Sequence, residues 1–484
     1  MTVPFEIPSV TMNLIFSVKD CSMSRPHAAY IAWGFPPSRS GGTYRQLATA
    51  NALAAAGWDV TVVTVDRTAF TTITGADESL EALVDPRVTV LRTRFDWPLR
   101  NQDRSTWPAL RRIAPPVWLR ARVLYEKAIF PEVGYAEWLA TLRSALDELH
   151  QRRPIDLVLA TGNPHVSFAA AHRLHQSHGV PYVMDYRDAW LLDVFTGQRT
   201  ASDHSRLARL ERRLIAAASQ VWFINQDILD WHATRYPAAA SRFRLVPNGW
   251  DPSLLDLGGG DGLGSQAAAR QGANGRPGEA MARKGAGRPL TFGYLGTMSA
   301  NAPMPQVVEG WKRAKERGLL PPDSILKLGG YLGYFGGPPD PAKDPVAAAV
   351  LGNAESGVEY VGRVDKTAVG PFYGSLDALV LPIKAGRYVT SGKVYEYVAT
   401  GKPVVSIHPP EAGASKVLEG YPLWVPVTAM TTSETAAAFG RAADLLQHIT
   451  PAQTAEALAF GGRLTRERQL GPAIAGLKDL LPPA

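Results

Sequence analysis

The residues best suited to chemistry lie at positions 388–406, in the sequence YVTSGKVYEYVATGKPVVS. Ser391, Gly392 and Lys393 stand where a loop is predicted to pass into a helix, and the free N–H groups of a helix N-terminus attract anions. Glu396 follows about one turn later, so its carboxylate can face the same ligand and accept two hydroxyl groups. The spacing suits a nucleoside diphosphate, with its phosphates at the helix start and its ribose on the carboxylate. For these residues in isolation, a capped helix with a solvated glutamate is the simpler interpretation.

Three residues near the middle of the chain are candidates for proton transfer. His165 follows an Asn-Pro pair in a predicted strand-to-helix loop, where the sites of α/β folds gather, although a single loop histidine is more often structural. Asp188, in the sequence DYRDAW, is either a base or a helix N-cap that pairs with Arg187. Asp185 is a third candidate, with a simple pairing to Arg187 as its alternative.

The elements that would position these residues alternate between strands and helices. In the first half of the chain, strands are predicted at AAYIAWGF, DVTVVTVD, VTVLRT, IDLVLATG, PYVMDY, QVWFIN and FRLVPNG. In the second half, they are predicted at LTFGYLG, ILKLGGY, VEYVG, ALVLPI and PVVSIH. Helical patterns separate most of them, and the first of these ends at Gly57. The alternation predicts an α/β fold of two doubly wound, Rossmann-like domains that face a cleft, where ligands of such sheets bind.

Changes in composition suggest the domain boundaries. We expect an N-terminal domain over residues 1–248 and a C-terminal domain over residues 249–460. Residues 461–484 are expected to form a helix that packs back on the first domain. Residues 258–288 are mostly Gly, Ala, Arg and Gln with almost no bulky apolar residue, which predicts a flexible insertion in the second domain.

A basic insertion is predicted in the first domain, over residues 91–127. It holds nine Arg or Lys residues against three acidic residues, with Trp97, Trp107 and Trp118 interleaved. One interpretation is a segment that packs on the domain and leaves a solvated basic face. A second is an amphipathic surface for membrane headgroups or a lipid-linked substrate, because Trp and Arg suit the membrane interface. The arginines of that surface would be Arg100, Arg104, Arg111, Arg112, Arg120 and Arg122. A third, nucleic-acid binding, is disfavoured because no recognised nucleic-acid module accompanies the segment.

The composition excludes several classes of protein. The 484 residues include 51 Lys and Arg against 44 Asp and Glu, a net charge of +7 that suits anionic substrates or a membrane surface and does not require nucleic acid. The single cysteine, Cys21, cannot form an internal disulfide, which favours a reducing compartment. No run of about 18 apolar residues occurs, and the N-terminus lacks the pattern of a signal peptide. We therefore expect a cytoplasmic protein, with peripheral contact to the inner face of the membrane as an option.

Motifs along the chain resemble those of the glycosyltransferases of family 4, which have the two-domain GT-B architecture. GKVYEYVATGKPVV is similar to the nucleotide-binding helix of that family, and LVPNGWD is similar to its junction into the second domain. FPPSRSGG, with the following helix and GWDVTVVT, resembles its N-terminal glycine loop. TGNPHVSFAAAHRLHQSHGVPYVMDYRDAW resembles a subgroup pattern that faces the cleft. The resemblance runs from about Tyr30 to the C-terminus, outside the two insertions.

The resemblance implies a retaining transfer from a nucleotide-diphosphate sugar, with neither a metal ion nor a cofactor. No Asp-x-Asp triplet for a divalent ion occurs in the chain. The family often has a glutamate at the position of Tyr388, where it contacts the transferred sugar, and a basic pair in the segment that Gly296 and Thr297 begin. Arg363 is expected near the base. The binding residues implied are Gly41, Gly42, Gly296, Thr297, Arg363, Ser391, Gly392, Lys393 and Glu396.

Three functions are compatible with such a cleft. The leading prediction is a hexosyltransferase-type enzyme with His165, Asp188 and Asp185 as catalytic residues and a glycan, a lipid-linked molecule or a small molecule as acceptor. The alternatives are a nucleotide-sugar epimerase of the same fold, and a non-catalytic sugar-nucleotide binder if Tyr388 disables transfer. The basic insertion favours an acceptor surface and therefore the transferase. A dinucleotide oxidoreductase is excluded because no G-x-G-x-x-G follows a predicted first strand.

Overall fold

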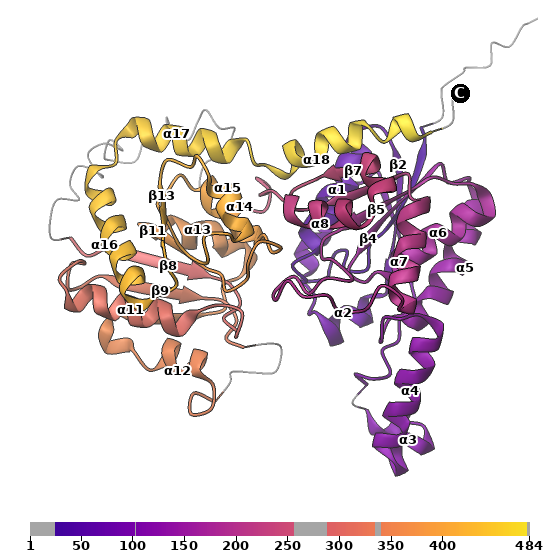
Figure 1. Cartoon of the computed structure of the whole chain (residues 1–484), viewed down its shortest axis with the longest axis horizontal. Coiled ribbons are helices and arrows are strands. Elements are labelled where there is room, and N and C mark those ends of the chain that lie inside the picture. Colours follow the sequence, from indigo (N-terminus) through magenta and orange to yellow (C-terminus); the bar gives the residue numbers. More distant parts are fainter. Residues whose placement is uncertain (1–24, 102, 256–287, 334–339, 482–484) are drawn as a thin grey trace, which may run out of the picture.

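The protein folds into two α/β domains that are linked in the chain and bridged by C-terminal helices (Figure 1). The computed structural model describes residues 25–101, 103–255, 288–333 and 340–481. The N-terminal residues with Cys21, and nearly all of the predicted flexible insertion at 258–288, lie outside the described residues. None of the helices in the described ranges combines the length and apolar character that a membrane span requires.

The N-terminal domain is built on a seven-stranded parallel sheet in the order β3-β2-β1-β4-β5-β6-β7. Its strands are β1 (His27–Ile31), β2 (Asp59–Val65), β3 (Val88–Thr93), β4 (Leu157–Gly162), β5 (Tyr182–Tyr186), β6 (Gln220–Phe223) and β7 (Phe243–Leu245). The helices around it include α1 (Thr43–Ala55), α2 (Arg67–Ile73), α5 (Ala136–Arg152), α6 (Val166–His178), α7 (Arg206–Ala217) and α8 (Gln226–Arg235). Alternate residues of β1 enter two different core clusters, Ala28 and Tyr30 in one and Ala29 and Ile31 in the other. Both faces of the sheet are therefore buried, which is why its strands read as continuous apolar runs.

The C-terminal domain has a six-stranded parallel sheet in the order β10-β9-β8-β11-β12-β13. Its strands are β8 (Thr291–Leu295), β9 (Ile325–Gly329), β10 (Val358–Gly362), β11 (Ala378–Pro382), β12 (Val404–Ile407) and β13 (Trp424–Pro426). Its helices include α11 (Met304–Glu316), α12 (Pro345–Leu351), α13 (Val369–Gly374), α14 (Gly392–Ala399), α15 (Gly413–Leu418) and α16 (Thr432–His448). In both sheets the strand order reverses at the first strand, and ligands of such sheets bind at that point. The predicted fold class, two doubly wound domains of the GT-B type, is confirmed.

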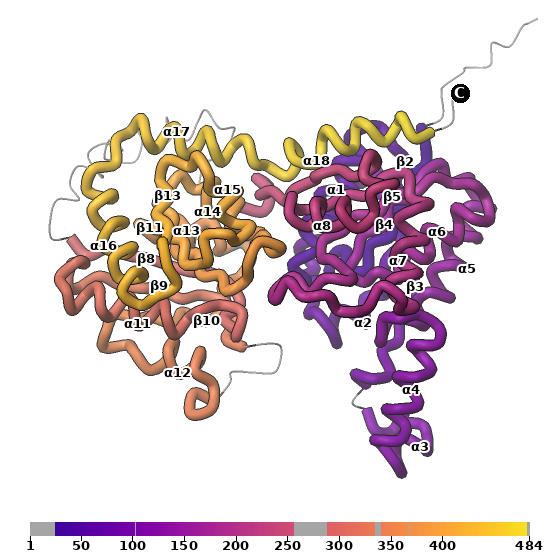
Figure 2. Tube along the Cα trace, viewed as in Figure 1, coloured from indigo at the N-terminus to yellow at the C-terminus, as the bar shows by residue number. Residues whose placement is uncertain are grey.

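The last two helices cross from the second domain to the first (Figures 1 and 2). α17 (Pro451–Gly462) packs on α14, and α18 (Arg466–Ala475) packs on α1. Leu470, Ile474 and Leu477 are buried in the core cluster that contains Leu47 of α1. Apolar burial therefore fixes the end of the described chain to the N-terminal domain.

The basic insertion forms a helical hairpin that projects from the first domain, in purple at the lower right of Figure 1. β3 pairs with β2 as far as Thr93, so residues 91–93, which we expected in the insertion, belong to the sheet. The hairpin consists of α3 (Ala109–Ile113) and α4 (Pro115–Ile129). α4 begins with two prolines, which the first turn of a helix tolerates because its N–H groups have no partner within the helix.

Candidate active site

The helix start predicted at Ser391 is the start of α14. Ser391 is the N-cap residue, and its hydroxyl accepts a hydrogen bond from the Lys393 N–H at 3.4 Å. A β-carbon added at Gly392 would meet no atom within 4 Å. Open space therefore lies in front of the first turn, where the N–H groups of a helix attract an anion.

Glu396 lies one turn into α14 and is enclosed by groups that stabilise its charge. Its Oε2 accepts a hydrogen bond from the Tyr373 hydroxyl at 2.8 Å, and its Oε1 lies 3.9 Å from Lys366 Nζ. Burial by itself raises the pKa of Glu396, but Lys366, Lys393 and the Tyr373 hydroxyl outweigh burial and lower the pKa below its usual value. The side chain is 23 % exposed. The site therefore presents an ionised carboxylate with room for a hydroxyl donor.

Lys393 connects α14 to the loop after β8. Its Cε passes so close to Gly296 that a β-carbon at Gly296 would overlap it. Its ammonium lies 6.0 Å from the centroid of the Tyr294 ring, and the Tyr294 hydroxyl donates to the Thr297 carbonyl at 3.2 Å. Burial lowers the pKa of Lys393, against the opposing effect of Glu396. The structure thus brings Gly296 and Thr297 to the start of α14, and the lack of a side chain at Gly296 makes room for the lysine.

Arg363 lies apart from this group. It follows the edge strand β10, and its guanidinium carbon is 4.6 Å from the centroid of the Tyr331 ring. No polar contact joins Arg363 to the α14 side chains within the described residues. Lys366, three residues later, reaches Glu396 and also lies 4.3 Å from the centroid of the Tyr44 ring in the first domain. Lys366 is therefore the cation after β10 that contacts the carboxylate.

The N-terminal domain contributes a glycine loop and an arginine. Gly41 and Gly42 come directly before α1, and a β-carbon at Gly41 would meet no atom within 4 Å. A β-carbon at Gly42 would overlap the guanidinium of Arg187. Arg187 donates through Nε to the Gly162 carbonyl at 2.9 Å and through Nη2 to the Asn163 carbonyl at 2.8 Å. Two carbonyl groups therefore hold the guanidinium against the glycine loop.

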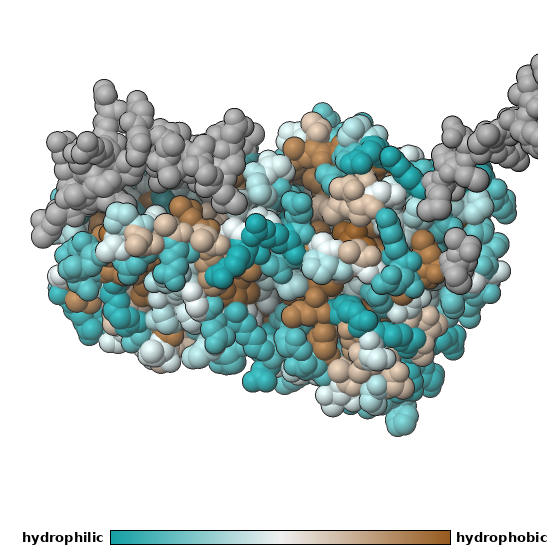
Figure 3. All heavy atoms as spheres, turned by 90° about the horizontal axis from the view of Figure 1, so that it is seen from above, coloured by the Kyte–Doolittle hydropathy of each residue, from teal (hydrophilic) through white to brown (hydrophobic). Residues whose placement is uncertain are grey.

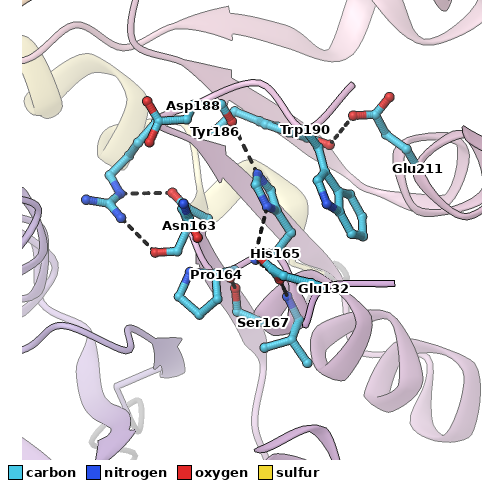
Figure 4. Close-up of polar contacts among 12 residues, drawn as sticks. Glu132, Asn163, Pro164, His165, Ser167, Tyr186, Asp188, Trp190 and Glu211 are labelled. Carbon is cyan, nitrogen blue, oxygen red and sulfur yellow. Dashed lines mark hydrogen bonds and ion pairs between the residues drawn. The ribbon is translucent and has the colours of Figure 1, made fainter. Parts of the chain in front are cut away.

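His165 is enclosed between Glu132 and the loop after β5, as Figure 4 shows. Its Nδ1 lies 3.2 Å from Glu132 Oε1, its Nε2 lies 3.3 Å from the Asp188 carbonyl, and its ring stacks on Trp190 with centroids 4.8 Å apart. Glu132 Oε2 also accepts the N–H groups of His165 and Val166 at the start of α6, at 2.7 and 3.1 Å. Burial by itself lowers the pKa of His165, but the hydrogen bond and charge of Glu132 outweigh it and raise the pKa. Because both ring nitrogens face acceptors, the protonated ring fits this position.

Asp185 forms a buried ion pair with an arginine of α1. Arg45 donates to its two carboxylate oxygens at 2.7 and 3.0 Å, and the two side chains are 3 % and 1 % exposed. The suggested pairing of Asp185 with Arg187 is therefore wrong. Arg45 also donates to the Pro247 carbonyl at 3.1 Å and to Asn248 Oδ1 at 3.4 Å. The pair therefore joins α1 and β5 to the start of the linker between the domains.

Asp188 lies in the loop after β5 with an exposed side chain. Its suggested role as a helix N-cap is wrong, because the next helix, α7, begins at Arg206 and has Ser205 as its N-cap. Its suggested partner Arg187 is bonded to backbone carbonyls instead. The Asp188 carboxylate therefore faces solvent, while its carbonyl faces His165.

The loop that precedes α14 contacts the first domain. Asn225 Nδ2 donates to the Arg387 carbonyl at 2.9 Å and to the Thr390 hydroxyl at 3.2 Å. Tyr388 packs against the N-terminal core, with its ring 3.4 Å from where a β-carbon of Gly197 would lie. These contacts hold the start of α14 opposite the first domain, and they occupy the tyrosine that stands where a sugar-contacting glutamate is common.

Comparison with known protein families assigns the N-terminal domain. Residues 40–249 match the family model described as a glycosyl transferase 4-like domain. Residues 40–249 therefore form a glycosyl transferase 4-like domain, and the chain is a glycosyltransferase. No protein of curated function matches the sequence of this transferase.

Solved structures of the same fold cover nearly the whole transferase. Sucrose-phosphate synthase from Thermosynechococcus elongatus is 18 % identical with a TM-score of 0.56, over 94 % of this chain and 98 % of its own. Anabaena HepE in complex with UDP is 16 % identical with a TM-score of 0.57, over 94 % of this chain and 100 % of its own. An E. coli trehalose-6-phosphate protein bound with UDP-2-fluoro glucose is 12 % identical with a TM-score of 0.59, over the same shares. At these identities the likeness concerns the fold.

Sequence reasoning missed several residues of the transferase site. Glu132 is 33 residues from His165, and Tyr373 is 23 residues from Glu396, so no local spacing signals either contact. Sequence reasoning named Arg363 as the basic residue after β10 and missed Lys366, because no local spacing signals the contact of Lys366 with Glu396. Arg187 directly follows β5, where the sites of parallel sheets gather, so its position offered a signal that we assigned only to aspartate pairing.

Proposed function

We propose that this glycosyltransferase moves a sugar from a nucleoside diphosphate sugar to an acceptor, with retention of the anomeric configuration and without a metal ion. The observation that carries the proposal is the ionised Glu396, one turn inside a helix whose start is open. The ribose hydroxyls would donate to Glu396 while the diphosphate lies at Ser391, Gly392 and Lys393. The related folds solved with UDP and UDP-2-fluoro glucose support a uridine nucleotide as the first donor to test.

The cations in the site would stabilise the leaving diphosphate. As the bond between the anomeric carbon and the diphosphate oxygen breaks, negative charge grows on the diphosphate. Lys393 and the N-terminus of α14 would stabilise this charge from the second domain. Arg187, held against Gly42, would stabilise it from the first. These groups would replace the basic pair that this sequence lacks after β8.

The three predicted catalytic residues take different parts in this proposal. Asp188 has an exposed carboxylate in the loop that carries Arg187, so it would accept the proton of the acceptor hydroxyl. His165 is paired with Glu132, and Asp185 is paired with Arg45. They would act as positioning residues that hold the loop after β5 and the start of α1 in place.

The acceptor would approach from the N-terminal domain. We propose a glycan, a lipid-linked molecule or a small molecule in this role, in a cytoplasmic setting and without a nucleic acid partner. The exposed apolar and basic side chains of α3 and α4 favour the lipid-linked acceptor, presented at the inner face of the membrane.

Two measurements test the proposed transfer. Titration calorimetry with UDP, GDP and ADP in EDTA measures nucleotide binding, and release of nucleoside diphosphate from the matching nucleotide sugars measures transfer. A transferase releases nucleotide, whereas an epimerase converts the nucleotide sugar without an acceptor and a non-catalytic binder shows affinity without turnover. Failure of all three nucleotides to bind would contradict the proposal.

A further inference from the structure

Most of the exposed large hydrophobic side chains of the described chain gather on one small element. Of the twelve that are exposed, seven belong to the apolar hairpin, residues 109–129 with α3 and α4. They are Leu110, Ile113, Val117, Leu119, Leu124, Tyr125 and Ile129. The most exposed are Ile113 at 83 % and Leu124 at 69 %. On the face seen in Figure 3, by contrast, hydrophobic residues form groups separated by hydrophilic ones.

The apolar hairpin is held in its shape by contacts of two arginines within it and with the residues at its base. Arg111 is 9 % exposed, donates to the carbonyls of Pro98 and Asn101 at 2.6 and 2.7 Å, and lies over the rings of Trp107 and Trp118. Arg122 is bonded at 2.7 Å to Glu126 of the same helix and at 2.6 Å to Glu137 of α5. These contacts do not involve the apolar side chains. The hairpin therefore keeps its shape while its apolar side chains stay exposed.

This arrangement corrects the surface expected from the sequence. Arg111 and Arg122 are engaged within the hairpin and at its base, and Trp97 packs on Tyr135 with ring centroids 5.1 Å apart. These three side chains are therefore not free to contact a membrane. The exposed surface of the hairpin consists mainly of aliphatic side chains, with Arg112 and Arg120 of the expected set and Lys127 beside them.

The exposed charges of the apolar hairpin are all positive. Arg112, Arg120 and Lys127 are exposed. The only acidic residue of this segment, Glu126, is buried and paired with Arg122. An apolar surface with a cationic rim and no exposed carboxylate is complementary to a surface that is negative outside and apolar beneath.

We propose that the apolar hairpin docks into the surface of a lipid bilayer that contains anionic lipid. The side chains of Ile113, Val117 and Leu124 enter the boundary of the acyl chains, while Arg112 and Arg120 contact the headgroups. The hairpin projects from the domain, so it reaches the bilayer before the rest of the protein does (Figures 1 and 2). A second copy of this chain is a poorer partner, because a symmetric contact would bring the cations of two hairpins together.

A docked hairpin would bring the N-terminal domain to a lipid-linked acceptor, a role that rests on the proposed function. Membrane binding itself does not require transfer. Calorimetry with UDP therefore tests the nucleotide site separately, and either proposal can fail without the other.

Co-sedimentation with vesicles of phosphatidylcholine, with and without phosphatidylglycerol, tests the docking. The full chain is expected to bind the anionic vesicles. The variant Ile113→Ser/Val117→Ser/Leu124→Ser should bind them roughly tenfold more weakly or worse, because it removes the apolar contact. A matched control, Leu245→Ser/Leu351→Ser, removes exposed hydrophobic residues elsewhere and should bind like the native chain.

A second variant keeps the test decisive if the first fails to fold. Arg112→Ser/Arg120→Ser retains the apolar residues and should lose the preference for anionic vesicles. Native protein that does not bind anionic vesicles, or that binds them no better than either hairpin variant, overturns the inference. Size-exclusion chromatography that shows a native dimer, reduced to a monomer by the apolar variant, would also overturn it in favour of a second copy.

Discussion

Replacing Glu396 by glutamine tests the nucleotide site with little change of shape. The amide oxygen can still accept the hydrogen bond of the Tyr373 hydroxyl, which now measures 2.8 Å. What is lost is the negative charge, which faces Lys366 at 3.9 Å and would accept the ribose hydroxyls. The substitution therefore acts on the ligand contact more than on the packing of α14.

The expected loss of affinity follows from the number of hydrogen bonds affected. A hydrogen bond to a charged group contributes about 1.5–3 kcal/mol and a neutral one about 0.5–1.5 kcal/mol, so each of two ribose contacts loses about 1 kcal/mol. The total is about 1–3 kcal/mol, because the amide nitrogen also replaces one acceptor. This corresponds to a roughly 5- to 150-fold increase of the dissociation constant for UDP.

The assay is titration calorimetry of a double-mutant cycle. Native protein and the Glu396→Gln variant are each titrated with UDP and with 2′,3′-dideoxyuridine diphosphate, which lacks both hydroxyls. The native protein should prefer UDP, and the variant should show a smaller preference, because its amide oxygen makes only a neutral hydrogen bond to the ribose. Glu309→Gln, on the exposed face of α11 with its side chain 52 % exposed, is the control and should behave like the native protein.

Two results would refute this reasoning. One is an unchanged affinity of the Glu396→Gln variant for UDP. The other is an equal loss for UDP and for the dideoxy ligand, since that would place the effect of Glu396 on the diphosphate or on the fold and away from the ribose.

Three further predictions concern stability and metal dependence. Asp185→Asn should lower the free energy of unfolding in urea by about 3–5 kcal/mol, because it leaves the buried Arg45 charge without its partner. The raised pKa of His165 means that the ion pair with Glu132 stabilises the fold fully below about pH 6.5, the usual value, and that this contribution is lost as pH rises through the folded pKa. The stability difference between native protein and His165→Gln should therefore shrink from pH 6 to pH 9. Turnover should be unchanged by EDTA and by added magnesium or manganese.

The first of these predictions has a control variant, and all three have a result that would contradict them. The control Asp323→Asn, at an exposed position, should change the free energy of unfolding little. If Asp185→Asn lowers the free energy of unfolding no more than this control does, the buried ion pair does not stabilise the fold as argued. A stability difference for His165→Gln that grows with pH would reverse the assigned protonation state. Activity abolished by EDTA and restored by a divalent ion would contradict metal-independent transfer.

The sequence by itself determined the parts of this protein that depend on short spacing. Apolar runs separated by helical patterns predicted two doubly wound sheets, because burial on both faces leaves a continuous apolar strand. The start of α14 followed from Ser391 as an N-cap, and Glu396 had to lie one turn further on, since a helix repeats about every 3.6 residues. These relations depend on local backbone geometry and not on tertiary packing.

Only the tertiary structure decided which partner each buried charge has. Asp185 is paired with Arg45, 140 residues away, and His165 with Glu132, 33 residues away. These pairs depend on how helices and strands pack, which no local pattern encodes. The same holds for the basic insertion: its composition was equally compatible with arginines outside or inside. The fold placed Arg111 inside, where the carbonyls of Pro98 and Asn101 satisfy its guanidinium, and left Ile113 83 % exposed and outside the core clusters.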